Sequence, residues 1–105
     1  MTEIIRTNIG VTTYLTPTGS IADKEALAAF AAAFDECMEA GAKKVVVVME
    51  RVPSLTGEAL EFLLDKQDAL VARGGQLTVI QPNSLLKEIF MITDFDKYVE
   101  VKERP

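Results

Sequence analysis

The chain has 105 residues, of which 49% are apolar and 26% charged, which is typical of one globular domain (1–105). Its net charge of −5 repels nucleic-acid phosphates and anionic lipids, and it contains no histidine and one cysteine, Cys37. This composition excludes an internal disulfide, histidine-based metal or acid–base chemistry, and nucleic acid as an expected partner. Because no apolar run reaches membrane-spanning length and the N-terminus has no leader pattern, we expect no membrane insertion and a cytoplasmic location.

The first third of the chain predicts a hairpin and a helix. VTTYLT, residues 11–16, is rich in β-branched and aromatic types that favour a strand, and IIRTN, residues 4–8, can pair with it as an antiparallel edge. Asp23 is placed to cap a helix whose apolar residues recur every three or four positions and which ends near Gly41.

The rest of the chain alternates strands with helices. KKVVVVM, residues 43–49, is a continuous apolar run, which indicates a central strand buried on both faces of a sheet. A helix follows over about 57–73, then a strand at 76–80, a short helix opened by the turn at 82–84, and a strand at 98–101. This order predicts an α/β domain with a mostly parallel or mixed β-sheet and helices packed on it.

Three segments of the chain resemble the STAS domain, the fold of bacterial anti-sigma factor antagonists. Gly19, Ser20, Ile21 and Asp23 are similar to the Gly-x-Leu-Asp segment before the first helix of that family, with one extra residue. VVVVMERVPSLTGEALEFLL is similar to its strand, turn and second helix, and RGGQLTVIQPNSLLKEIFMITDFDKYVEV to its closing section. The resemblance implies a STAS-like single domain over nearly the whole chain.

The resemblance also implies a modified switch. In the family the turn usually reads Asp-Ser-Ser-Gly-Leu, and a partner kinase that is also the anti-sigma factor phosphorylates its first serine. Without a gap this motif falls on residues 56–60, which places Gly57 at the acceptor position; with a two-residue gap the acceptor is Leu55. Neither residue has a hydroxyl, so the usual phosphoserine switch is absent at that position.

Three residues near this turn have two interpretations each. Ser54 and Thr56 fit N-caps of the second helix, or they are displaced phosphorylation sites. Glu58 fits a first-turn carboxylate stabilised by the helix dipole, or it permanently supplies part of the negative charge of a phosphate.

The resemblance implies a non-enzymatic protein-binding module without cofactor or metal. Its partner would be an anti-sigma factor or kinase-like protein, and its binding would regulate sigma-factor-dependent transcription. The surface would comprise the turn 52–57 and the exposed side of the helix 58–70; the predicted contact residues are Ser54, Thr56, Gly57, Glu58, Glu61 and Asp65. Two alternatives remain: a STAS subunit of a stress-signalling or lipid-transport assembly, and a STAS domain that binds a lipid or nucleotide in a pocket near the same turn.

Four other features have simpler explanations than a functional site. Cys37 falls on the first predicted helix, where a cysteine is typically a small buried hydrophobe. Asp94 and Asp96 are expected in a solvated loop before the last strand. Met49 and Met91 fit either the core or an adaptable partner surface. The glycine-rich loops that cradle nucleotide phosphates are absent.

Overall fold

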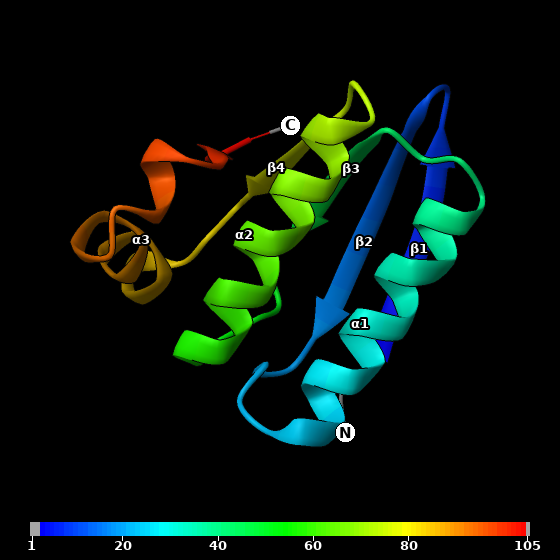
Figure 1. Cartoon of the computed structure of the whole chain (residues 1–105). Coiled ribbons are helices and arrows are strands. Elements are labelled where there is room, and N and C mark those ends of the chain that lie inside the picture. The colour runs from blue at the N-terminus through cyan, green and yellow to red at the C-terminus, as the bar shows by residue number, and fades with distance from the viewer. Residues whose placement is uncertain (1–2, 105) are drawn as a thin grey trace.

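The computed structural model describes residues 3–104, which form a five-stranded mixed sheet covered by helices (Figure 1). The strands are β1 (Glu3–Ile9), β2 (Thr12–Thr18), β3 (Lys44–Val48), β4 (Gln76–Ile80) and β5 (Glu100–Lys102). They lie in the sheet in chain order; β1 is antiparallel to β2, and the other neighbours are parallel. The predicted fold class, the edge hairpin and the central position of the valine-rich strand are confirmed.

Three α-helices connect the parallel strands: α1 (Lys24–Glu39), α2 (Gly57–Ala72) and α3 (Ser84–Ile92). A 3-10 helix, η1 (Phe95–Lys97), lies where the sequence suggested a loop, and it buries the Phe95 ring while Asp94 and Asp96 remain exposed. Strand β5 therefore begins two residues later than predicted. Within residues 3–104 no helix is long and apolar enough to cross a membrane.

The prediction that the central strand is buried on both faces is wrong. Val45 and Val47 are fully buried, but the alternate residues Val46 and Val48 are only half-buried. The reason is the strand order, because successive right-handed crossovers that move in one direction place every helix on the same face. Figure 1 shows α1 and α2 on that face.

The core lies between this face and the helices and contains two aromatic groups. Phe30 and Phe34 of α1, with ring centroids 5.4 Å apart, pack against Phe62 of α2 at 5.5 and 5.7 Å. Phe90 of α3 stacks on Phe95 at 4.7 Å. The Cys37 side chain is also buried, which confirms the prediction that it is a core residue. Of the two methionines considered, Met49 is buried in the core and Met91 is exposed. Each helix therefore contributes apolar side chains to one continuous core.

Candidate functional site

Three loops meet at the carboxyl ends of β2, β3 and β4, and each leads into a helix. The first helical turns are closed by side-chain caps: Asp23 accepts from the Ala26 N–H at 2.8 Å, and Asn83 accepts from the Leu86 N–H at 2.8 Å. Thr56 caps α2 in the same way through a longer contact of 3.3 Å. This end of a parallel sheet is where α/β folds usually place their functional loops.

The turn before α2 is fastened to the loop that follows β2. The Ser54 carbonyl accepts from the Ile21 N–H, and the Thr56 N–H donates to the Ile21 carbonyl, both at 3.1 Å. These two bonds form a short parallel bridge between Ile21 and Leu55. The Ser54 hydroxyl also donates to the Ser20 hydroxyl oxygen at 3.0 Å. The two loops that resemble family segments are therefore joined by backbone and side-chain bonds.

Asn83 holds the other side of the same turn. Its amide nitrogen donates to the Pro53 carbonyl at 3.0 Å, while its oxygen caps α3. The turn is thus fixed from both neighbouring loops, although Pro53 and Gly57 remain exposed. A rigid but accessible turn suits recognition, because little conformational entropy is lost when a partner binds.

The two hydroxyl residues of the turn have different roles. Thr56 is the N-cap of α2, as predicted. The N-cap prediction is wrong for Ser54, which lies two residues before the cap, and its hydroxyl contacts Ser20 instead. Both side chains are half-buried.

Gly57 is the first residue of α2 and is exposed. A Cβ built on Gly57 meets no atom within 4 Å, and its φ is not in the left-handed region. A serine therefore fits at this position without strain, so the backbone does not require glycine there. Leu55, the acceptor in the alternative alignment, is only 8% exposed and belongs to the core.

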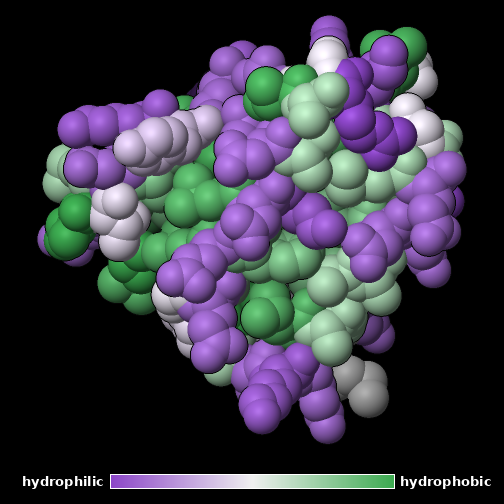
Figure 2. All heavy atoms as spheres, in the orientation of Figure 1, coloured by the Kyte–Doolittle hydropathy of each residue, from purple (hydrophilic) through white to green (hydrophobic). Residues whose placement is uncertain are grey.

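Glu58, Glu61 and Asp65 project from the exposed side of α2, next to the turn. Their spacing of three and four residues places them on one helix face, and all three are exposed. Figure 2 shows hydrophilic side chains along the outward side of this helix. Among the described residues none of the three forms an ion pair, and no group of acidic, histidine or cysteine side chains has the arrangement of a metal site.

Comparisons with known proteins bear on the fold of this chain. No family model matches the sequence. A Thermotoga neapolitana protein named as a candidate anti-sigma factor antagonist is 25% identical over 68 residues, which are 65% of this chain. The match spans 60% of the length of that relative.

The similarity of the solved structures extends over almost the whole chain. A candidate anti-sigma factor antagonist from Thermotoga maritima superposes with a TM-score of 0.87 at 20% identity, over 95% of this chain and 86% of the other. SpoIIAA, an anti-sigma factor antagonist solved in its unphosphorylated form, gives 0.75 at 14% identity, over 98% and 89% of the two chains. This chain has the STAS fold of the anti-sigma factor antagonists.

Within the STAS fold, the candidate surface includes two residues that sequence reasoning did not assign to it. Ser20 was placed only in the segment that resembles Gly-x-Leu-Asp, and Asn83 only at the start of a helix. Their contacts with Ser54 and Pro53 join residues 30 or more positions apart, and no local pattern signals such pairs. The available signal was that both residues lie in segments that resemble the family, Ser20 in segment 19–23 and Asn83 in the closing section.

Proposed function

We propose that this chain is a cytoplasmic protein-binding module that occupies an anti-sigma factor or a related kinase-like protein and so regulates a sigma factor. The STAS fold supports this class, and so do the names of the three relatives described above, which call them established or candidate antagonists of anti-sigma factors. Such a module acts by competition and needs neither cofactor nor metal. With a net charge of −5, it has no nucleic-acid partner in this proposal.

The observation that carries the proposal is the combination of a rigid exposed turn with an acidic helix face that forms no ion pair with any residue of 3–104. Ser54, Thr56 and Gly57 belong to the turn, and Glu58, Glu61 and Asp65 extend the surface along α2. Charges without partners in the free protein are available for a complementary surface, where they steer association and set specificity. The partner should therefore present basic residues toward α2.

The phosphorylation switch is proposed to be absent at Gly57. SpoIIAA has been solved in unphosphorylated and phosphorylated forms, so a protein with this fold does carry the modification. Gly57 has no hydroxyl, and the Thr56 oxygen already caps α2. A phosphate on Ser54 would need to displace its bond to Ser20. Control of the complex would then come from protein amount or from a different modification, and the fixed charge of Glu58 would supply part of the negative charge of a phosphate.

The test is affinity capture from the native lysate with tagged wild type, Glu61→Lys and Glu39→Lys. Glu39 is also an exposed acid and lies at the far end of α1, so its variant is the matched control. We expect wild type and Glu39→Lys to recover the same kinase-like protein, and Glu61→Lys to bind it about tenfold or more weakly. Equal recovery by all three variants would place the interface elsewhere.

The switch is tested with Gly57→Ser, which the open space at this position accommodates. After incubation with the captured kinase and ATP, we expect phosphate on the serine variant and none on wild type, read by intact-protein mass spectrometry. Phosphate on Ser54 or Thr56 of wild type would show instead a displaced site.

A second candidate function, a STAS subunit of a larger signalling or transport assembly, is favoured by the helix-free face of the sheet. Ile5 and Ile9 of β1 are 53% and 62% exposed on that face, and strand β2 separates them from the half-buried Val46 and Val48 of β3. Exposed apolar side chains that gather on one face often mark an interface. Recovery of several stoichiometric subunits, in place of one kinase-like protein, would support this function.

A further inference from the structure

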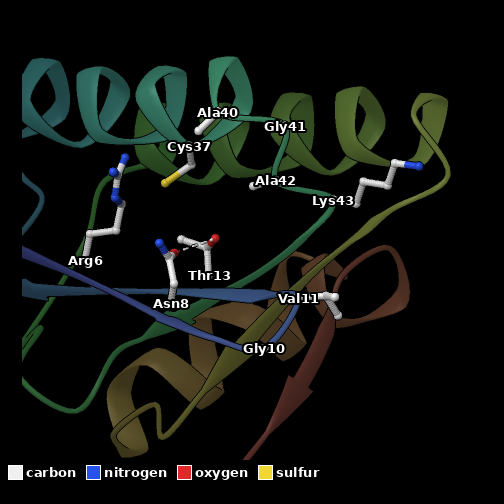
Figure 3. A pocket seen from close by; sticks show the side chains of 10 residues that line it. All are labelled: Arg6, Asn8, Gly10, Val11, Thr13, Cys37, Ala40, Gly41, Ala42 and Lys43. Atoms are coloured by element: carbon white, nitrogen blue, oxygen red, sulfur yellow. Dashed lines mark hydrogen bonds between the residues drawn. The ribbon is translucent and has the colours of Figure 1, made fainter.

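An open cavity of about 380 Å³ lies between the β1–β2 hairpin and the carboxyl end of α1 (Figure 3). It is at the opposite end of α1 from the candidate turn, and this helix of 16 residues is about 24 Å long. The ligand pocket that the sequence suggested near the turn is therefore not the same feature. The cavity is within the range of about 300–1,000 Å³ that is typical of small-molecule sites.

The cavity exists because polar and small residues replace large apolar ones between strand and helix. On β1, Arg6 and Asn8 occupy the face that packs toward α1, and both line the cavity. On the helix side the lining residues are small, with Cys37 and Ala40 before the turn at Gly41. Large apolar side chains do not fill this space as they fill a closely packed core, so a ligand can enter.

The side chains that project into the cavity are hydrogen-bond donors. The Asn8 oxygen accepts from the Thr13 hydroxyl at 3.0 Å, which turns the amide nitrogen of Asn8 toward Cys37. The Arg6 guanidinium approaches the same sulfur from the neighbouring position on β1 (Figure 3). Lys43 extends from the outer rim.

The charge of the cavity is positive although the protein is acidic. The chain has 16 acidic residues, yet none of them lines this cavity. Neither Arg6 nor Lys43 forms an ion pair within residues 3–104. Burial raises the pKa of the Cys37 thiol, against the opposing effect of Arg6. The thiol is therefore neutral at physiological pH and does not neutralise the guanidinium. The acid that acts on the thiol is Glu36 of α1, which also raises the thiol pKa but does not line the cavity.

Two carbonyls at the end of α1 are already bonded and do not compete with a ligand for the donors of the cavity. The Met38 carbonyl accepts from the Arg73 guanidinium at 2.8 Å, and the Cys37 carbonyl accepts from the Ala42 N–H at 3.0 Å. These bonds weaken the negative end of the helix dipole next to the cavity. A ligand must itself bring the acceptors and the negative charge.

We propose that this cavity binds a small organic anion, whose phosphate or carboxylate group is held by the Arg6 guanidinium and the Asn8 amide. Arginine presents two parallel N–H groups that match either anion, and the amide adds a further donor. Lys43 contributes attraction from the rim. The volume accommodates a metabolite larger than the anionic group alone.

The test is a titration of 15N-labelled full chain with sodium phosphate or sodium succinate, with sodium chloride at matched ionic strength as reference. We expect saturable shifts of backbone amide signals from residues 6–13 and 37–43, and Arg6→Gln should weaken binding about tenfold or more. The relative response to the two probes identifies which anionic group is preferred. Lys97→Gln is the control, because Lys97 is an exposed cation on η1 with its own partner, Asp94.

Asn8→Asp provides an independent variant if Arg6→Gln does not fold. The aspartate keeps an acceptor for Thr13 but replaces the donor with a negative charge beside Arg6, so it should abolish binding. The proposal is overturned if the shifts do not saturate, if chloride reproduces them, or if the folded variants bind as wild type does.

Discussion

Asn83 fastens the candidate turn to α3 in two ways, which two substitutions can distinguish: its oxygen caps the helix, and its amide nitrogen donates to the turn. The nitrogen donates to the Pro53 carbonyl at 3.0 Å and, more weakly, to the Val52 carbonyl at 3.5 Å. Asn83→Ala removes both the cap to Leu86 and the donor to Pro53. Loss of an N-cap costs about 1 kcal/mol, and loss of a neutral hydrogen bond costs about 0.5–1.5 kcal/mol. We therefore expect the free energy of unfolding to fall by about 2 kcal/mol.

Asn83→Asp should cost less, because the carboxylate keeps the cap and loses only the donor. Its charge at the start of α3 adds about 0.3–1 kcal/mol, which offsets part of the loss. We expect a net decrease of about 1 kcal/mol or less. The control is Ser84→Ala, since this exposed neighbour has no side-chain hydrogen bond among the described residues, and it should change stability by less than about 0.5 kcal/mol.

Urea unfolding followed by circular dichroism gives the free energy of unfolding of wild type and of the three variants. The melting temperature provides a check, since a loss of about 1 kcal/mol lowers it by about 4–8 °C for a domain near this size. If the aspartate variant were as unstable as the alanine variant, the cap would contribute nothing. If both unfolded at the wild-type midpoint, neither bond of Asn83 would stabilise the protein in solution.

Two further predictions concern Gly75 and Cys37. A Cβ on Gly75 would lie 2.0 Å from the Lys43 carbonyl oxygen, so the free energy of unfolding of Gly75→Ala in urea should fall by about 1–3 kcal/mol or more. Gly57→Ala has open space around its Cβ and should be neutral or slightly stabilising. Equal stability of the two variants would contradict the close contact at Gly75. The Cys37 thiol is 1% exposed, so a thiol reagent should label it only as the protein unfolds, and rapid labelling of the native protein would show that it is accessible. Folding raises the pKa of this thiol, so the neutral thiol contributes to the free energy of unfolding. This contribution is fully present below the thiol pKa of the unfolded chain and is lost as the pH rises through the thiol pKa of the folded protein. Unfolding measured at alkaline pH should show this dependence for wild type, and Cys37→Ala should lack it.

The alternation of strands and helices could be predicted from sequence because each element carries its own local signal. Asp23 and Thr56 were predicted as caps since a capping side chain bonds to a backbone N–H only three residues away. The valine run of β3 identified a strand, but its composition did not show that helices cover only one face. That property depends on the order in which the strands pair, which is a feature of the whole chain.

Polar contacts across the fold were the least predictable part. Gln67 lies on the inward side of α2, where its oxygen accepts from the Leu77 N–H at 2.8 Å and its nitrogen donates to the Tyr98 carbonyl at 3.2 Å. From sequence it is simply one polar residue among leucines. The bond between Ser20 and Ser54 is equally hidden, because its two residues are 34 positions apart.

The agreement between sheet order and chain order has a consequence for synthesis on the ribosome. Every strand pairs with the strand that precedes it, and the parallel registers join residues 32 positions apart from β2 to β3 (Thr12 with Lys44) and from β3 to β4 (Lys44 with Gln76). Each newly emerged strand can therefore add to an edge that already exists, without waiting for the C-terminus. The sheet can grow vectorially, one strand and helix at a time, as the chain leaves the exit tunnel.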